Sequence, residues 1–236
     1  MHEEYHRWYS PSLGREMEML VFGHAGEPVL VFPTSMGRYF EYKDFGMIGM
    51  LADRIADGYL QIFCPDGVDA ESWYNRAVHP RQRVLRHVQY ENYIIHEVLP
   101  FIHHRAPQGF LIATGCSFGA FHSVNFAFRH PALVNKIIAL GGDYDIHGRL
   151  NGYYDDECYY NCPVDFIPNL SDHALLEQMR RMEIYLAAGE ADFCLAGTKR
   201  LAELLSRKGI PRHLDVWGDG AGHDWPYWRK MIREYL

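Results

Sequence analysis

The strongest constraint on the fold is a regular alternation of apolar, strand-like runs with stretches of helical periodicity, from residue 28 to the C-terminus. The runs are short and apolar throughout, as expected for strands that are buried on both faces. The stretches between them place apolar residues three or four positions apart and often stop at glycine or proline. Strands and helices that alternate in this way form a mostly parallel sheet with helices on both faces.

The alternating part predicts a series of strands and helices with short connections. The expected strands lie at 28–33, 59–65, 109–115, 136–142, 182–189 and 213–217. The expected helices lie at 47–58, 81–105, 118–130, 195–208 and 225–236. Two further strand candidates, around Glu4–Tyr9 and Glu16–Phe22, flank the turn-forming segment S-P-S-L-G. They predict an N-terminal antiparallel hairpin.

One long segment, residues 143–172, interrupts the alternation, because it is aromatic and has no period. Structureless segments of this length are uncommon inside compact domains. We therefore expect a loop or a small cap over the C-terminal edge of the sheet. No repeat or Pro/Gly/Ser-rich linker divides the chain, so residues 1–236 are expected to form a single α/β domain.

Charge and cysteine content limit the partners and the compartment. The chain has 23 basic and 30 acidic residues, well mixed, with a formal net charge of −7 and no basic run, so no nucleic acid is expected as a partner. It has no signal-peptide pattern and no apolar stretch near the ~18 residues that span a bilayer, so no membrane association is expected. Five cysteines without framework spacing fit free thiols in a reducing compartment, by default the cytoplasm.

The segment G-C-S-F-G, residues 115–119, places Ser117 between an expected strand and an expected helix. In that context G-x-S-x-G holds a serine on a sharp, strained turn with its Oγ exposed. The helix that begins at Phe118 also offers an unpaired N–H to a developing oxyanion. The alternative is that the small residues only allow the strand and helix to pack closely. Cys116 is expected to pack rather than react, because the turn places residue 117 at its tip.

A serine nucleophile needs a base, and the base needs an acid that orients it. In sheets of this kind the three follow the order serine, acid, histidine. His223 lies in a glycine-rich loop between the last expected strand and helix; the alternative is a solvated loop histidine. Asp192 follows the strand 182–189; the alternative is a helix N-cap. Other candidates for the acid are Asp143, Asp145 and Glu190.

A second oxyanion donor is expected from the loop P-T-S-M-G, residues 33–37, where the backbone N–H of Ser35 or Met36 would serve. Aromatic side chains are the expected walls of the substrate pocket, although they serve equally to pack loops onto the sheet. They suit a compact or ring-bearing acyl or alcohol group. The substrate-binding candidates are Trp73, Tyr74, Tyr153, Tyr154 and Trp225, with Tyr159 and Tyr160 beside them.

No cofactor or metal is expected. The chain has no H-E-x-x-H and no paired C-x-x-C motif. The pairs His2 with His6 and Asp143 with Asp145 have only weak metal-ligand spacings, which are more common as surface and loop features.

Three segments resemble the α/β-hydrolase fold and, within it, the esterases related to esterase D, feruloyl esterases and mycolyltransferases. They are D-A-E-S-W-Y-N-R (69–76), P-V-D-F-I-P-N-L (163–170) and G-H-D-W-P-Y-W (222–228), and the resemblance covers nearly the whole chain. It implies a mostly parallel central sheet with an N-terminal antiparallel hairpin and helices on both faces. It also implies a Ser117–Asp192–His223 triad, with oxyanion N–H groups from Phe118 and the 34–36 loop.

The combined expectation is a serine hydrolase that cleaves small-molecule carboxylic esters through an acyl-enzyme intermediate. Two alternatives stay open. An acyltransferase, thioesterase or peptidase would use the same three residues, and a binding protein would keep the fold without catalysis. The outer edges of the sheet also leave room for a homo-oligomer.

Overall fold

The computed structural model describes residues 2–236 and contains an eight-stranded sheet in the order β1-β2-β4-β3-β5-β6-β7-β8. β1 and β2 form the N-terminal antiparallel hairpin, and every neighbouring pair from β4 to β8 is parallel. The predicted α/β class and sheet type are therefore confirmed. The strands are β1 Glu3–Ser10, β2 Arg15–Phe22, β3 Glu27–Phe32, β4 Leu60–Pro65, β5 Ile112–Cys116, β6 Lys136–Leu140, β7 Glu183–Gly189 and β8 His213–Trp217.

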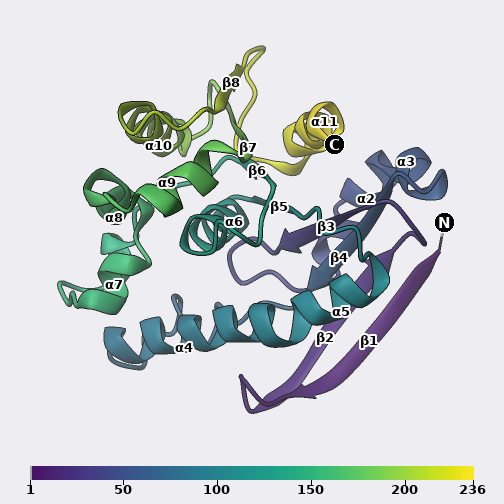
Figure 1. Cartoon of the computed structure of the whole chain (residues 1–236), viewed down its shortest axis with the longest axis horizontal. Coiled ribbons are helices and arrows are strands. Elements are labelled where there is room, and N and C mark those ends of the chain that lie inside the picture. The colour runs from purple at the N-terminus through teal and green to yellow at the C-terminus, as the bar shows by residue number, and fades with distance from the viewer. Residues whose placement is uncertain (1) are drawn as a thin grey trace.

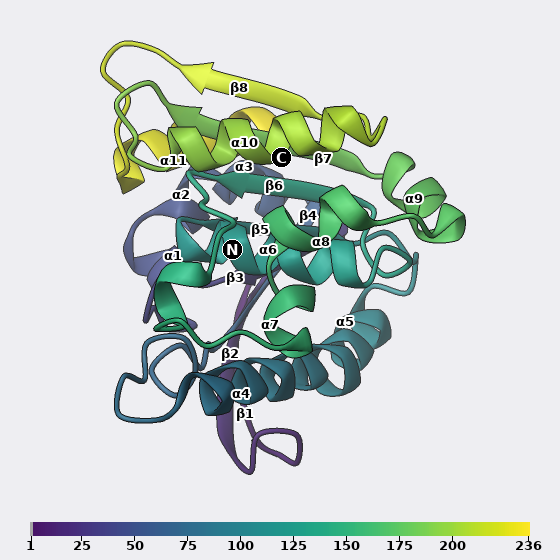
Figure 2. The same ribbon diagram turned by 90° about the vertical axis from the view of Figure 1, so that its left-hand side faces the viewer.

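Helices cover both faces of the sheet (Figures 1 and 2). α1–α3 and α11 pack with one apolar cluster, and α4, α6, α8 and α10 pack with another on the opposite face. The helices are α1 Glu41–Asp44, α2 Met47–Met50, α3 Ala52–Ala56, α4 Pro80–Tyr93, α5 Leu99–Arg105, α6 Phe118–Arg129, α7 Asp156–Tyr160, α8 Pro163–Asn169, α9 His173–Arg180, α10 Leu195–Arg207 and α11 Trp225–Tyr235, with a π-helix at Ile94–Val98 and a 3₁₀-helix at His147–Arg149.

Burial along the strands follows their place in the sheet. β4 and β5 are buried at every position, which explains their uninterrupted apolar sequences. β1 lies at one edge and alternates between exposed and half-buried residues, while β8 at the other edge is exposed along most of its length. The parallel strands therefore direct their carboxyl ends, with the loops that follow them, to one edge of a rigid central sheet.

Two predicted helices differ in detail from the structure. The stretch 47–58 contains two short helices, α2 and α3, with a break at Leu51. The stretch 81–105 is continuous but widens into a π-helix at Ile94–Val98, just before Pro100. Because proline has no N–H to donate to the preceding turn, the α-helical pattern cannot continue unchanged there.

The aperiodic segment 143–172 holds a 3₁₀-helix and two α-helices, α7 and α8. α7 contacts α4, and α8 contacts both α6 and α10, so much of the segment packs into one helical layer. α9 follows directly and was not predicted, although Asp172 caps its first turn through the Leu175 N–H. These helices are short and contain proline or mixed polar residues, so no apolar period marks them.

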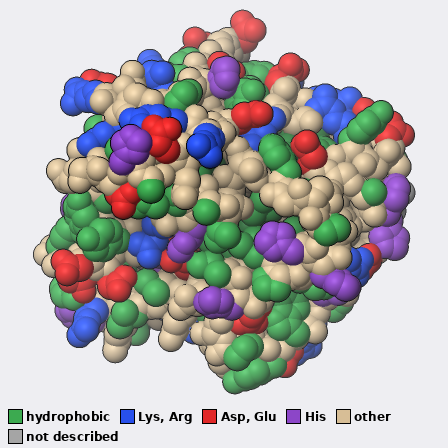
Figure 3. Space-filling model, viewed as in Figure 1, with side chains coloured by type: hydrophobic (Ala, Val, Ile, Leu, Met, Phe, Trp, Pro, Cys, Tyr) green, Lys and Arg blue, Asp and Glu red, His purple; other side chains and the backbone are tan. Residues whose placement is uncertain are grey.

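On the face seen in Figure 3, acidic and basic side chains are interspersed with apolar ones. Among residues 2–236, no helix combines the length and apolar character that crossing a membrane requires.

Candidate active site

Ser117 lies at the tip of the turn between β5 and α6, with φ 56° and ψ −120°. This backbone region is unfavourable for a residue with a side chain, so the surrounding structure must hold it. The Ser117 N–H donates to the carbonyl of Leu140 at 2.8 Å. The flanking glycines let the turn form, because a Cβ on Gly115 would lie 2.3 Å from the backbone of Gly119, and one on Gly119 would lie 2.3 Å from the Phe32 carbonyl oxygen.

His223 connects the serine to an acid. It lies in the loop between β8 and α11, and its Nε2 is 2.9 Å from Ser117 Oγ. Its Nδ1 is 2.8 Å from Asp192 Oδ1. Three residues that are more than 100 positions apart at the extremes therefore form one continuous hydrogen-bonded chain. The edge of the Trp228 indole packs on the imidazole, with ring centroids 4.8 Å apart.

Asp192 is 5% exposed and lies after β7. Its Oδ1 also accepts the Cys194 N–H at 2.7 Å, so the same oxygen orders the start of α10 and contacts the histidine. Among residues 2–236, Asp192 Oδ2 and Trp228 Nε1 are both buried without a hydrogen-bond partner. A Cβ on Gly141, where φ is 60°, would lie 2.6 Å from that Oδ2, so glycine leaves the room that the carboxylate occupies.

The other candidate acids lie elsewhere. Glu190 accepts a hydrogen bond from the Gly220 N–H at 2.7 Å and so stabilises the loop between β8 and α11 that carries His223. Asp145 accepts hydrogen bonds from His147 and Arg200. Asp143 is exposed. Among the described residues, Asp192 is the carboxylate that contacts His223.

The expected oxyanion donors differ in availability. The N–H of Phe118 lies in the first turn of α6, next to Ser117. The Met36 N–H already donates to Asp69 Oδ2 at 3.2 Å. The Ser35 N–H has no acceptor among residues 2–236, and the Ser35 hydroxyl lies 2.5 Å from the hydroxyl of Tyr74. A donor role for the N–H groups of Phe118 and Ser35 stays a prediction.

A buried polar pair that the sequence did not reveal supports this loop. Asp69 Oδ1 lies 3.0 Å from His122 Nε2, and the two side chains are 7% and 4% exposed. Because Asp69 also accepts the Met36 N–H, the pair links α6 to the loop that carries Ser35. Glu41 fixes the other end by accepting the Thr34 N–H, and burial raises the pKa of its carboxyl.

A cavity of about 280 Å³ opens at Ser117. Phe193 lies over the imidazole of His223 with 4.1 Å between ring centroids and is itself 77% exposed. The Arg149 guanidinium lies over the rings of Tyr74 and Phe118. The lining residues are Ser35, Tyr74, Ser117, Phe118, Asp143, Asp145, Arg149, Phe193 and Cys194.

Of the five aromatic candidates for the pocket wall, Tyr74 alone is among the residues that line this cavity. Trp73 is 1% exposed and packs on Phe121 beneath the surface. The other three pack on neighbours outside the cavity. Tyr153 contacts His79 edge-to-face, whereas Tyr154 stacks on His147 and Trp225 stacks on Phe45. A substrate-binding role for these four side chains stays a prediction, since side chains that pack loops have the same composition as side chains that line a pocket.

Tyr159 and Tyr160 line a different cavity of about 410 Å³, between the C-terminal end of α6 and the helices α7–α9. None of the three hydrogen-bonded residues at Ser117 lines it. Its size alone therefore does not make it the candidate active site.

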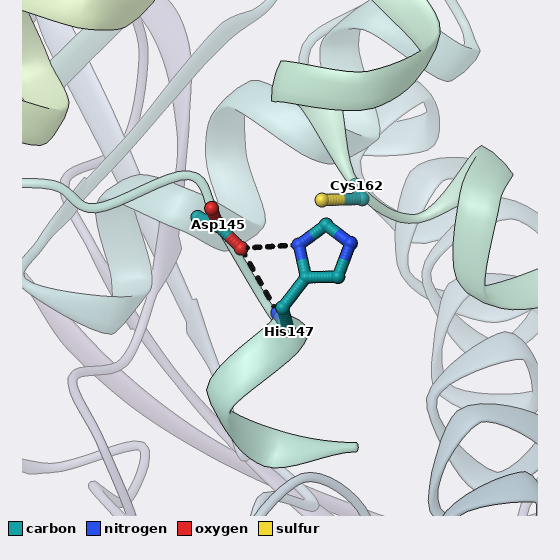
Figure 4. Close-up of side chains that lie close together, drawn as sticks. All are labelled: Asp145, His147 and Cys162. Atoms are coloured by element: carbon teal, nitrogen blue, oxygen red, sulfur yellow. Dashed lines mark hydrogen bonds and ion pairs between the residues drawn. The ribbon is translucent and has the colours of Figure 1, made fainter. Parts of the chain in front are cut away.

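Asp145, His147 and Cys162 form a group whose ligand atoms lie within 4.8 Å of one another (Figure 4). His147 Nδ1 is 2.6 Å from Asp145 Oδ1, and Arg200 is 3.1 Å from Asp145 Oδ2, so both carboxylate oxygens are already engaged. Burial raises the pKa of the Cys162 thiol well above its usual range, which keeps it protonated and a poor metal ligand. Hydrogen bonds and ion pairs account for this group.

The cysteine next to Ser117 is buried in the core. Cys116 is 1% exposed, and burial raises the pKa of its thiol well above the usual range. It therefore packs against the core, as predicted, while Ser117 reaches the cavity.

Comparison with known proteins identifies the family and the fold. Residues 10–236 match the model of the family described as "Putative esterase". No curated protein matches the chain in sequence. The structure is similar to a ferulic acid esterase, with a TM-score of 0.80, 17% identity and coverage of 100% of this chain and 96% of that one.

Two further similar structures come from named organisms. An S-formylglutathione hydrolase from Staphylococcus aureus has a TM-score of 0.73 and 16% identity, covering 100% of this chain and 98% of that one. A ferulic acid esterase from Anaeromyces mucronatus, in complex with ferulic acid, has a TM-score of 0.73 and 15% identity, covering 100% and 89%. At these identities the likeness establishes the α/β-hydrolase fold. With a family match that spans nearly its whole length, the chain belongs to this family of esterases and is a carboxylesterase-type hydrolase.

Proposed function

We propose that Ser117 is the nucleophile, His223 the general base and Asp192 the orienting acid in the hydrolysis of small carboxylic esters. The observation that carries the proposal is the continuous chain from Ser117 Oγ to His223 Nε2, 2.9 Å, and from His223 Nδ1 to Asp192 Oδ1, 2.8 Å. A serine hydroxyl is a weak nucleophile until an adjacent base takes its proton. The strained turn holds Ser117 where the base can do so.

Acylation follows from this arrangement. His223 Nε2 takes the proton from Ser117 Oγ while Oγ attacks the carbonyl carbon of the ester. The negative charge that develops on the carbonyl oxygen is stabilised by the N–H groups of Phe118 and Ser35. The imidazolium is stabilised by Asp192, and it then gives its proton to the departing alcohol as the C–O bond breaks. Ser117 is left as an acyl ester.

Deacylation uses the same groups, with water in place of Ser117 as the nucleophile and Ser117 Oγ as the leaving group. His223 removes a proton from water, and the resulting hydroxide attacks the acyl carbon within reach of the same two N–H groups. The bond to Ser117 Oγ then breaks, and the imidazolium returns its proton to that oxygen. The carboxylic acid leaves, and the site is restored without a cofactor taking part in any step.

The cavity supports a compact or ring-bearing substrate group. It measures about 280 Å³, and Tyr74, Phe118 and Phe193 supply aromatic surface on its walls. The exposed ring of Phe193 offers a surface for a flat substrate group, because the faces of Tyr74 and Phe118 already carry Arg149. A long lipid chain exceeds this volume. The ferulic acid esterases among the similar structures act, by their names, on esters of an aromatic acid, which fits this class.

We also propose that the protein works in a reducing compartment such as the cytoplasm. Its five cysteines are free, and each is buried. Burial raises the pKa of several of these thiols, which protects them from oxidation but provides no cross-link. Free thiols without any disulfide are typical of reducing compartments.

The test is hydrolysis of p-nitrophenyl esters, from acetate to octanoate, by the wild type, Ser117→Ala and Ser206→Ala. Ser206 lies exposed on α10 and serves as the control. We expect Ser117→Ala to lower kcat by about 10³-fold or more, with Ser206→Ala unchanged and the wild type favouring short acyl chains. Wild-type turnover that survives Ser117→Ala would contradict the proposal. The same assays with added alcohol or amine acceptors separate hydrolysis from acyl transfer.

A further inference from the structure

We propose that Arg149 forms an anion-binding subsite in the cavity of Ser117, so that the preferred ester carries a carboxylate near its scissile bond. This inference rests on the proposed function of Ser117 and names the substrate class for that same site. Arg149 and Ser117 line one cavity of about 280 Å³. The carboxylate belongs to the acyl or the alcohol part of the ester, a few bonds from the carbonyl that Ser117 attacks.

The guanidinium lies over two aromatic rings, Tyr74 and Phe118, which meet at 87° with their centroids 5.6 Å apart. Its Cζ lies 4.3 Å from the ring centroid of Tyr74 and 4.2 Å from that of Phe118. Arginine stacks on aromatic faces through cation–π attraction while its N–H groups stay free at the edges of the plane. Because Arg149 and Ser117 line the same cavity, this stacking fixes a positive charge in the cavity onto which Ser117 opens.

The N–H groups of this guanidinium lack protein partners. Among residues 2–236, no carboxylate lies within ion-pair distance of Arg149, and its side chain donates no hydrogen bond. Nearby arginines differ: Arg200 pairs with Asp145 at 3.1 Å, and Arg83 donates to two backbone carbonyls. A planar fork of unused donors is the geometry that binds a carboxylate through two parallel hydrogen bonds.

The backbone of Arg149 is fixed as well. Arg83 Nη1 donates to the Arg149 carbonyl oxygen at 2.8 Å, and the same guanidinium donates to the Val78 carbonyl. Arg83 is 2% exposed, so a buried cation from α4 anchors the end of the 3₁₀-helix that carries Arg149. A guanidinium that is anchored and stacked before a ligand arrives loses little freedom on binding one.

Two carboxylates in the cavity limit the number of negative charges that the substrate can carry. Asp145 is already paired with His147 and Arg200. Asp143 has no such partner among the described residues and lies against α10, where a Cβ on Gly197 would be 2.6 Å from its Oδ1. The cavity therefore favours one anionic group beside Tyr74 and Phe118 and disfavours a second one near α10.

The alternative is that Arg149 only packs against the aromatic rings. The charge of the substrate distinguishes this packing role from a carboxylate-binding role. If Arg149 only supports the aromatic wall, its replacement affects neutral and anionic esters of the same shape equally. If it binds a carboxylate, the replacement acts on the anionic ester, because a charge-assisted hydrogen-bonded pair is lost.

The kinetic test compares meta-acetoxybenzoate with meta-acetoxybenzamide, two acetyl esters of similar shape that differ in charge. The measured quantity is the ratio of their kcat/KM values for the wild type, Arg149→Met, Arg149→Lys and Arg181→Met. Arg181 is exposed at the end of α9, so Arg181→Met makes the same change in net charge away from the cavity. We expect the wild type to favour the anionic ester and Arg149→Met to lower the ratio by about 10- to 100-fold. Arg149→Lys should fall between them, and Arg181→Met should match the wild type.

An equal loss for both esters in Arg149→Met, or an unchanged ratio, would overturn the subsite. Calorimetric titration with meta-hydroxybenzoate and meta-hydroxybenzamide gives a readout that needs no turnover. Tighter binding of the benzoate by the wild type, lost in Arg149→Met, supports the subsite even if neither ester is cleaved. Equal binding of the benzoate by both proteins overturns it even if Ser117 proves to be the nucleophile.

Discussion

At the scale of single residues, the site depends on carboxylates that accept more than one hydrogen bond. Asp192 Oδ1 accepts from both His223 and the Cys194 N–H. Asp69 accepts from His122 through one oxygen and from the Met36 N–H through the other. Asp192 therefore joins His223 to the start of α10, and Asp69 joins the loop that carries Ser35 to α6. Conservative changes at these positions should alter turnover more than folding.

Asp192→Asn tests the first of these links. The amide keeps the shape of the side chain but no longer stabilises an imidazolium, so we expect kcat to fall by about 10²- to 10⁴-fold with a smaller change in KM. Steady-state kinetics on a short p-nitrophenyl ester measures this. Glu203→Gln, an exposed change on α10 with the same loss of charge, is the control. A kcat within threefold of the wild type would show that Asp192 does not orient the base.

Asp69→Asn tests the second link. An amide cannot accept from both Met36 and His122, so the loop that carries Ser35 should shift by a fraction of an ångström. A misplaced oxyanion donor mainly raises the transition-state barrier, and we expect a fall in kcat of about 10-fold or more with KM little changed. If KM rises instead while kcat stays constant, the pair has another role.

The residues of the site differ in how far the sequence could predict them. Ser117, Asp192 and His223 each follow a predicted strand of the sheet, and parallel strands bring their carboxyl ends together, so their proximity was predictable. Arg149 and the Asp69–His122 pair were not predicted. Their partners come from segments that are distant in sequence, and a solvated charge or an ordinary helix residue would look the same in the sequence.

At the scale of helices and strands, the contact between β5 and α6 matters most for the site. The two elements approach through Gly115 and Gly119, where a Cβ would meet backbone atoms. Such close contact sets the position of Ser117 relative to the loop after β3, because a Cβ on Gly119 would also lie 2.8 Å from the Pro33 carbonyl oxygen.

Gly119→Ala and Gly49→Ala form a matched pair of helical glycine replacements. By helix propensity alone both should stabilise the fold, by about 0.5–1 kcal/mol. Gly49 has open space at its Cβ position, whereas the Cβ of Gly119→Ala would lie 2.3 Å from the Phe32 carbonyl oxygen. We expect Gly119→Ala to lower the free energy of unfolding by about 2 kcal/mol or more, and Gly49→Ala to raise it slightly, in urea titrations. Equal effects would contradict the close approach.

The sequence predicted the alternating elements better than the segment 143–172. The inner strands of the sheet coincide with apolar runs, because burial on both faces requires apolar side chains at nearly every position. The edge strands β1 and β8 are largely exposed, and their sequences are mixed. α7 and α8 have no such pattern, since their short lengths leave room for little more than one turn of apolar residues. Their positions depend on contacts with α4, α6 and α10 instead.

At the scale of the whole molecule, pH should control stability through a buried histidine. Burial, aided by the nearby His122, lowers the pKa of His87 from 6.5 to about 3, although Glu91 opposes the shift. Between pH 6.5 and about 3, His87 is protonated in the unfolded chain but stays neutral in the folded protein. This contribution to stability is therefore complete above pH 6.5 and is lost as the pH falls towards 3.

The expected slope is about 1.4 kcal/mol of unfolding free energy per pH unit, between roughly pH 6 and 4. Urea titrations of the wild type and His87→Gln at several pH values measure it, and the variant should lose this part of the slope. Glu91 contributes to the pH dependence of stability in a lower pH range. Its hydrogen bonds with His130 and Arg129 outweigh burial and lower its pKa to about 2, so its contribution is lost below pH 4.5. If the unfolding free energy of the wild type and of His87→Gln depends on pH with the same slope, a neutral, buried His87 is contradicted.

The measurement that tests the account most directly is covalent labelling of the purified protein with a fluorophosphonate, read by mass spectrometry of the peptides. We predict one label per chain on Ser117, no label in Ser117→Ala, and labelling slowed by about 10³-fold in His223→Gln. That result would establish an activated serine at the turn between β5 and α6. An unlabelled wild type, or a label on another residue with Ser117 unmodified, would contradict the central claim that Ser117 is the nucleophile.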